Sequence, residues 1–159
     1  MNSRDAIETM TQEDCWTMLD RHKVGRLAVD VGGEPDIFPI NFIVDDETIL
    51  FKTGAGTKLA AAVLSRHVAF EIDGQGDANR TVWSVIVKGI AHEVDNMYER
   101  FEVEDLPLYP WVAGQKLRYV RIEPTLVTGR RFHVVDDAEV EPNTRLTEYQ
   151  PRAAQMRQS

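Results

Sequence analysis

The stretch FKTGAGTKLAAA, residues 51–62, changes from an apolar, strand-like start to an alanine-rich, helix-like end. Its two glycines predict a tight turn between a strand and a short helix that runs from Thr57 to Ser65. Thr57 is a suitable N-cap, but Lys58 adds positive charge at a helix end that the helix dipole already makes positive. A bound phosphate would make Lys52 and Lys58 favourable there. A plain strand–turn–helix connection with solvated lysines explains the stretch equally well.

The composition of the chain narrows its class. Its 159 residues suit one domain, which we expect over residues 1–135 with a polar tail over 136–159. The single cysteine, Cys15, excludes an internal disulfide and fits a reducing cytoplasm. The net charge of −8 argues against nucleic-acid binding, and no apolar run is long enough to span a membrane. We therefore expect a cytoplasmic protein, on which any anion site must be a locally positive patch.

The remaining pattern is mostly that of β-strands. Thr11 begins a predicted helix that ends at His22, and the loop GGEPD predicts a hairpin after the first strand. Gly89 predicts a bulge or bend in the longest strand. Strands are expected at residues 24–31, 37–44, 47–53, 67–72, 81–94, 117–124 and 125–135, with a short acidic helix at 97–103. Tight turns between most of these strands favour a mainly β, six- to seven-stranded antiparallel barrel.

Two further fragments suggest a binding surface. In FPINFIV, residues 38–44, the proline predicts an edge or a break in strand pairing. Free backbone groups beside Asn41 and Phe42 would suit a flat heteroaromatic ring, although an ordinary edge strand is an equal alternative. In TVWSV, Trp83 and Ser84 add an indole and a hydroxyl, but Trp83 is more typical of a core.

Other familiar motifs are absent from the sequence. GAGTKL lacks the Gly-Lys-Ser/Thr order of a nucleotide P-loop, and Ser84 lacks a nucleophile elbow. The four histidines have no metal-ligand spacing, so we expect no metal site. The sequence identifies no catalytic side chain.

Taken together, these fragments resemble the pyridoxamine 5′-phosphate oxidase-like FMN-binding split β-barrel family. The similarity is greatest to short bacterial members related to nitroimidazole reductases. It rests on Pro39-x-Asn41-Phe42, on the segment TGAGTK, on VWSVIVKGIAHEV and on VTGRRF. The resemblance implies a split barrel that forms a homodimer with cofactor sites at the subunit interface.

The resemblance also implies roles for individual residues. Lys52, Thr53, Thr57 and Lys58 would hold the FMN phosphate and ribityl chain. Ile40, Asn41 and Phe42 would line the isoalloxazine ring, and Trp83 and Ser84 would approach it from the partner subunit. Arg131 and His133 echo an Arg-x-His signature that grips the substrate in the vitamer oxidases, but the rest of that signature is missing here.

These features lead us to expect an FMN flavoprotein, an oxidoreductase that transfers hydride between the flavin and a small molecule. One alternative is an F420-dependent reductase of the same fold, although the long anionic tail of F420 would need an extended basic groove. A second alternative is a non-enzymatic protein that carries flavin or binds another protein. A few relatives bind haem.

Overall fold

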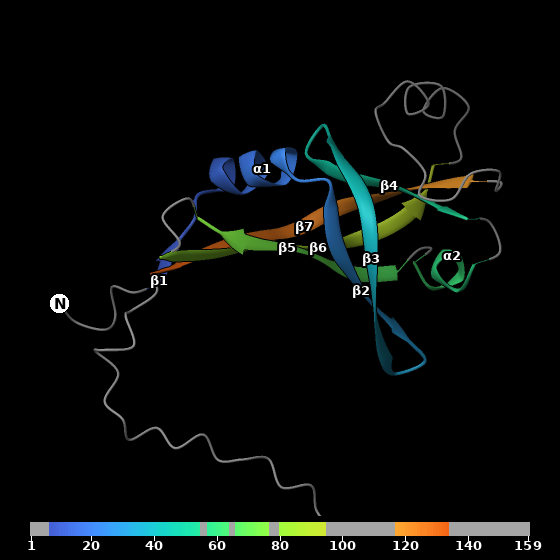
Figure 1. The fold of residues 1–159 in the computed structure, drawn as a ribbon. Coiled ribbons are helices and arrows are strands. Elements are labelled where there is room, and N and C mark those ends of the chain that lie inside the picture. The colour runs from blue at the N-terminus through green and yellow to red at the C-terminus, as the bar shows by residue number, and fades with distance from the viewer. Residues whose placement is uncertain (1–6, 55–56, 64–65, 77–79, 95–116, 134–159) are drawn as a thin grey trace, which may run out of the picture.

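The computed structural model describes residues 7–54, 57–63, 66–76, 80–94 and 117–133 (Figure 1). The elements in these ranges are β1 Ile7–Thr9, α1 Gln12–Arg21, β2 Val24–Val31, β3 Glu34–Asp45, β4 Thr48–Gly54, α2 Lys58–Val63, β5 Arg66–Gln75, β6 Thr81–Glu93 and β7 Leu117–His133. The helix expected at 97–103 and the tail expected at 136–159 lie outside the described residues. Within the described part of the chain, neither helix is long and apolar enough to cross a membrane.

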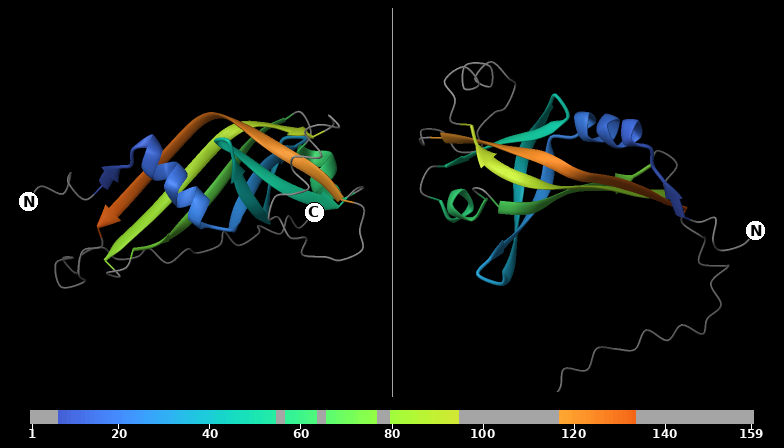
Figure 2. Two further views of the ribbon diagram at one scale, coloured as in Figure 1. Left: turned by 90° about the horizontal axis from the view of Figure 1, so that it is seen from above. Right: turned by 180° about the vertical axis from the view of Figure 1, so that it is seen from behind.

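The strands form one antiparallel sheet that closes into a barrel. Its order is β1-β7-β4-β3-β2-β5-β6, and β6 also pairs with β7, so the six strands from β2 to β7 make a closed ring. This arrangement confirms the predicted mainly β, six- to seven-stranded antiparallel barrel. Phe42, Phe51 and Phe70 are fully buried at its centre. The helices α1 and α2 lie toward opposite ends of the long strands (Figure 2).

The first helix forms where the sequence predicts it. The Thr11 hydroxyl accepts a hydrogen bond from the Asp14 backbone N–H at 3.1 Å, which satisfies one free donor of the first turn. Cys15 and Leu19, four residues apart, are fully buried against the barrel. Apolar spacing and an N-cap are therefore sufficient to define α1.

The hairpin between β2 and β3 is tighter than predicted. Only Gly32 and Gly33 form the turn, with φ angles of 62° and 86°, and β3 already begins at Glu34. Positive φ at both central residues is the geometry of a two-residue hairpin, which glycine adopts without steric cost. The predicted five-residue loop is therefore wrong in length.

The two closing strands expected at 117–124 and 125–135 are wrong, because residues 117–133 form the single strand β7. Gly89 pairs with Pro124 and Lys88 pairs with Leu126, so Thr125 is one extra residue at that step. The register shift confirms the irregularity predicted at Gly89, although the extra residue lies on β7 and not on β6. A side chain at Gly89 would overlap the Glu123 backbone carbonyl. The strands β6 and β7 can therefore approach this closely only because residue 89 is glycine.

The N-terminal strand β1 has no counterpart among the expected elements. Its residues Ile7–Thr9 pair with Arg130–Phe132 at one edge of β7, and all three are exposed. Three exposed residues have neither the length nor the alternation that predicts a strand.

Candidate functional site

The barrel splits between β3 and β4. Phe42–Asp45 pair with β4, whereas Glu34–Asn41 pair with β2 alone among the described strands. Beyond Phe51, β4 leaves β3 and continues against β7. The edge that the sequence predicts around Pro39 is therefore present, at the point where the two strands separate.

Lys52 and Thr53, at the end of β4, face opposite sides of the barrel wall. The Lys52 Nζ lies 5.0 Å from the centroid of the Tyr119 ring, and Tyr119 is its cross-strand partner on the outer face. The Thr53 side chain points inward and is only 5% exposed. Because β4 continues to Gly54, their side chains cannot contact one phosphate from the same side.

The hydroxyl of Thr57 caps the short helix α2. It donates to the Gly54 carbonyl at 2.8 Å and accepts from the Ala60 N–H at 3.1 Å, and the Thr53 hydroxyl lies 3.1 Å away. Each hydroxyl has one proton to donate. With Thr57 donating to Gly54, Thr53 donates to Thr57, and neither has a proton left for an anion in this arrangement. The side chain of Lys58 lies outside the described residues.

The sequence around Lys52 is free of acidic residues. No acidic residue lies between Glu47 and Glu71 in the sequence. Within the described part of the chain, Lys52 forms no ion pair. Its ammonium makes a cation–π contact with Tyr119 and can still donate hydrogen bonds to an anion. Lys52 is therefore a described cation that could pair with a phosphate.

The two sequence neighbours of Asn41 belong to the core. Phe42 and Phe51 are the last pair between β3 and β4, so Asn41 and Lys52 are the first residues beyond the point where the strands separate. Ile40 is 5% exposed and Phe42 is 1% exposed, and the Phe42 ring meets the Phe70 ring edge-on at 4.7 Å. Ile40 and Phe42 can therefore offer a ligand only backbone groups. The Phe42 N–H already donates to the Lys23 carbonyl at 3.0 Å, so it is not one of the free backbone groups that the sequence predicts.

Trp83 and Ser84 lie far from Lys52 in the same chain. Ser84 pairs with Arg130 on β7, which is 11 positions after Tyr119, the partner of Lys52. If β7 were straight, these positions would be roughly 35 Å apart. The Trp83 ring is 5% exposed and packs edge-on against His22, so only Ser84 presents its side chain outward. One chain thus contains two separate groups of predicted site residues.

The two weakly indicated substrate residues lie near this second group. The Arg131 Nη1 is 3.9 Å from a Glu8 carboxylate oxygen and 3.8 Å from one of Asp14, so these carboxylates would compete with a substrate anion. His133 is exposed at the end of β7.

A hollow of about 210 Å³ lies on the outer face of β6 and β7. Its lining residues are Ser84, Ile86, Thr128, Gly129, Arg130 and Phe132. Sequence reasoning identified Ser84 but missed Thr128 and Arg130. Strand alternation in VTGRRF separates Arg130 from Arg131, but only the register with β6 shows which one accompanies Ser84.

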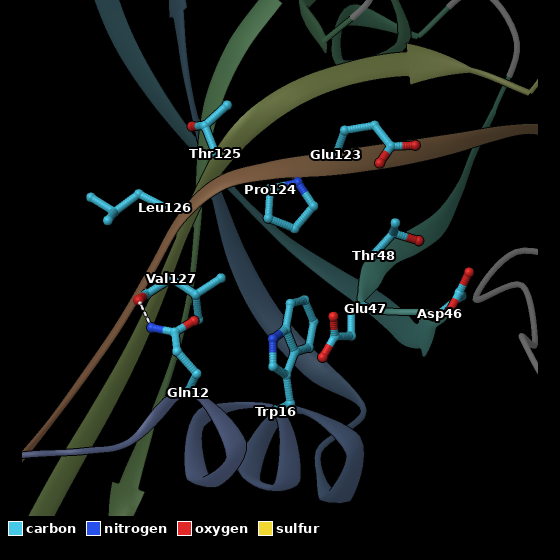
Figure 3. Close-up of a pocket in the computed structure, with 10 residues that line it drawn as sticks. All are labelled: Gln12, Trp16, Asp46, Glu47, Thr48, Glu123, Pro124, Thr125, Leu126 and Val127. Carbon is cyan, nitrogen blue, oxygen red and sulfur yellow. Dashed lines mark hydrogen bonds between the residues drawn. The ribbon is translucent and has the colours of Figure 1, made fainter.

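A larger cavity, of about 400 Å³, lies between α1, the β3–β4 turn and the bend in β7 (Figure 3). Trp16 forms one wall, and Gln12 Nε2 donates to the Val127 carbonyl at 2.6 Å beside it. Its acidic side chains are Asp46, Glu47 and Glu123. Like charge would repel a phosphate here, so this cavity does not fit a nucleotide.

Cys15 is not positioned for chemistry. Burial, and then the charge of Asp14, raise the pKa of its thiol, so the nucleophilic thiolate is disfavoured. Its sulfur packs where a side chain on Gly129 would otherwise lie.

A barrel with a split between two neighbouring strands defines this protein as a split β-barrel. Residues 11–131 match the family model of pyridoxamine 5′-phosphate oxidase, and the chain belongs to this family. An FAD-binding protein of Mycobacterium smegmatis is 38% identical, with a TM-score of 0.74 over 80% of this chain and 100% of that one. A conserved Corynebacterium diphtheriae protein of unknown function is 33% identical, with a TM-score of 0.69 over 80% and 99% of the two chains. An uncharacterised Mycobacterium tuberculosis protein is 32% identical over 82% of this chain and 88% of its own.

Proposed function

We propose that the protein is a homodimeric flavoprotein that transfers hydride between a bound flavin nucleotide and a small molecule. The observation that carries this proposal is the 38% identity to an FAD-binding protein, in a match that covers 80% of this chain and 100% of that protein. The part of the cofactor that the residues of β3, β4 and α2 would hold is FMN, which is also one half of FAD.

Lys52 and Asn41 are the described side chains best placed for that cofactor. Lys52 would pair with the phosphate on the outer face, and Asn41 would hydrogen-bond the ring or the ribityl chain beside it. Lys58 would add a second cation, as the sequence predicts. Thr53 and Thr57 would bind the phosphate only after giving up the hydrogen bonds that they now make to each other and to Gly54.

A second copy of the chain would complete each site. Ser84 is too distant from Lys52 in one chain, which favours its contribution from a partner. The surface around Ser84 exposes the apolar side chains of Val82, Ile86 and Leu126, which lie on adjacent strands and would be covered in a dimer. In a two-fold dimer, each copy would contribute the same residues to the site of the other copy.

The flavin, when bound, supplies the hydride chemistry. The residues of the chain would bind its phosphate, hold the ring at the split and exclude water between the two copies. We assign no side chain as general acid or base. The lone buried thiol, Cys15, supports a location in the reducing cytoplasm.

Absorbance spectra and gel filtration of the purified protein with FMN, FAD or F420 test the cofactor. We expect flavin absorbance to elute with the protein at the size of a dimer. If F420 elutes with the protein and neither flavin does, the cofactor is the deazaflavin F420 and not a flavin nucleotide. Elution without any of the three would refute cofactor binding. Reduction of the retained flavin by NADH or NADPH would then separate an oxidoreductase from a flavin carrier.

Subunit mixing tests the shared site. Lys52→Gln and Ser84→Trp should each weaken FMN binding about tenfold or more, because one removes a charge-assisted contact and the other fills the hollow. A heterodimer with one variant in each copy should retain one intact site, since both defects then fall in the other site. If each site lay within one copy, the heterodimer would have no intact site.

A further inference from the structure

Arg130 is a second cation that the flavin site described above does not use. It pairs with Ser84 on β6 and with Thr9 on β1, so hydroxyl-bearing residues flank it on both sides. Thr128, two residues earlier on β7, lies on the same face and lines the same hollow. Arg131 faces the other side of the strand, toward Glu8 and Asp14. Arg131 therefore lies near two carboxylates, whereas Arg130 lies beside neutral hydroxyls.

The charge of Arg130 is not neutralised by the described residues. Its side chain is exposed and forms no ion pair with them. A guanidinium beside neutral hydroxyls suits an oxyanion, because its planar donors bind two oxygens at once and hydroxyls add further hydrogen bonds. The ring of Phe132 and the side chain of Ile86 give the hollow apolar walls.

The hollow is small enough to be one chain's part of a ligand site that two copies form together. Its volume of about 210 Å³ is smaller than that of a typical small-molecule site, which is roughly 300–1,000 Å³. Exposed apolar side chains surround it, as at a surface that another molecule covers. A second copy that places its Lys52 side of the barrel over this face would enclose the ligand between the two chains.

We propose that Arg130, with Ser84 and Thr128, binds an oxyanion of a ligand held between the two copies. This proposal rests on the flavin site proposed above, and the oxyanion is distinct from the phosphate assigned to Lys52. Two ligands can supply it. One is FAD, through the second phosphate that FMN lacks. The other is a co-substrate with a phosphate or carboxylate group that binds beside FMN.

Arg130→Gln is the test variant, since glutamine keeps polarity and much of the side-chain length but removes the charge. Lys88→Gln is its matched control, because Lys88 is an exposed cation on the same face of β6 and lies outside the hollow. For both variants and the wild type, gel filtration measures assembly and fluorescence titration measures the affinities for FMN and FAD. Calorimetry then measures inorganic phosphate binding to the FMN-loaded protein.

If FAD supplies the oxyanion, Arg130→Gln should lose about tenfold or more in FAD affinity, with FMN affinity within about threefold of wild type. If a co-substrate supplies the oxyanion, Arg130→Gln should keep both flavin affinities, and its affinity for inorganic phosphate should fall about tenfold or more. Lys88→Gln should match the wild type in all three titrations.

Four results would overturn the assignment. The first is unchanged binding of all three ligands by Arg130→Gln, and the second is an equal loss of affinity in Lys88→Gln. The third is a monomeric Arg130→Gln protein, which would make Arg130 a dimer contact. The fourth is an equal loss of FMN and FAD affinity in Arg130→Gln, which would place Arg130 at the FMN half of the cofactor. A wild-type protein that binds neither flavin would refute the proposed function itself, whereas the other results leave that function standing.

Discussion

Replacing Phe42 with alanine should lower stability strongly, because its ring is 1% exposed and lies at the centre of the barrel. Phenylalanine-to-alanine changes in a core cost about 3–5 kcal/mol, and the edge-on contact with Phe70 contributes about 0.5–1.5 kcal/mol of that interaction. At about 2–4 °C per kcal/mol for a chain of this size, the melting temperature should fall by roughly 6–20 °C. Phe42→Leu keeps most of the volume and should cost about 1–2 kcal/mol.

Urea unfolding measures these changes, with an unchanged m-value as the sign that the folded state is intact. A double-mutant cycle with Phe70→Leu should give a coupling energy of about 0.5–1.5 kcal/mol. Folded Phe42→Leu protein should bind FMN within about threefold of wild type, since only the Phe42 backbone can reach a ligand. A large loss of FMN affinity with unchanged stability would refute this assignment and place the ring in the binding site.

Two other perturbations test the packing of the barrel. Gly89→Ala should lower the free energy of unfolding by about 1–3 kcal/mol or more, because the new methyl group overlaps the Glu123 carbonyl. Gly76→Ala is the control, since its methyl group meets only Thr81, at longer distances. Equal urea midpoints for the two variants would contradict the close approach of β6 and β7 at Gly89. The raised pKa of Cys15 keeps the folded thiol protonated while the unfolded thiol ionises above about pH 8.5. Its contribution to stability is therefore present below that pH and is lost as the pH rises through the folded pKa. Urea unfolding at pH 7.5 and pH 9.5 should show a larger fall for wild type than for Cys15→Ala; equal falls would contradict a raised pKa.

The first helix and β6 are predicted to within one residue at each end because each has two agreeing local signals. The first helix has both a cap at Thr11 and apolar spacing through Leu19. The long strand β6 has both alternation and a glycine where the bulge occurs. Local signals failed in β7, because Pro124 is typical of a strand end. In the folded chain, Pro124 faces Gly89, and the bulge there accommodates it without ending the strand.

The candidate site is less predictable from sequence, since it depends on which face each residue occupies. Alternation shows that Lys52 and Thr53 differ in direction, but only the pairing with β7 shows that Lys52 faces outward with Tyr119. The same holds for Arg130 and Arg131, whose surroundings depend on strands far away in the sequence. The pattern identifies residue types, and long-range register decides which of them can meet a ligand.

The position of β7 has a consequence for how the protein is made. This strand is the last of the described barrel strands, and it pairs with β1, β4 and β6. A growing chain on the ribosome would therefore carry unpaired edges on both β4 and β6 until residues 117–133 emerge. Open strand edges pair readily with other chains, and contacts between distant segments form slowly. Nascent chains that stall before this strand should be the form most prone to aggregate and most in need of a chaperone.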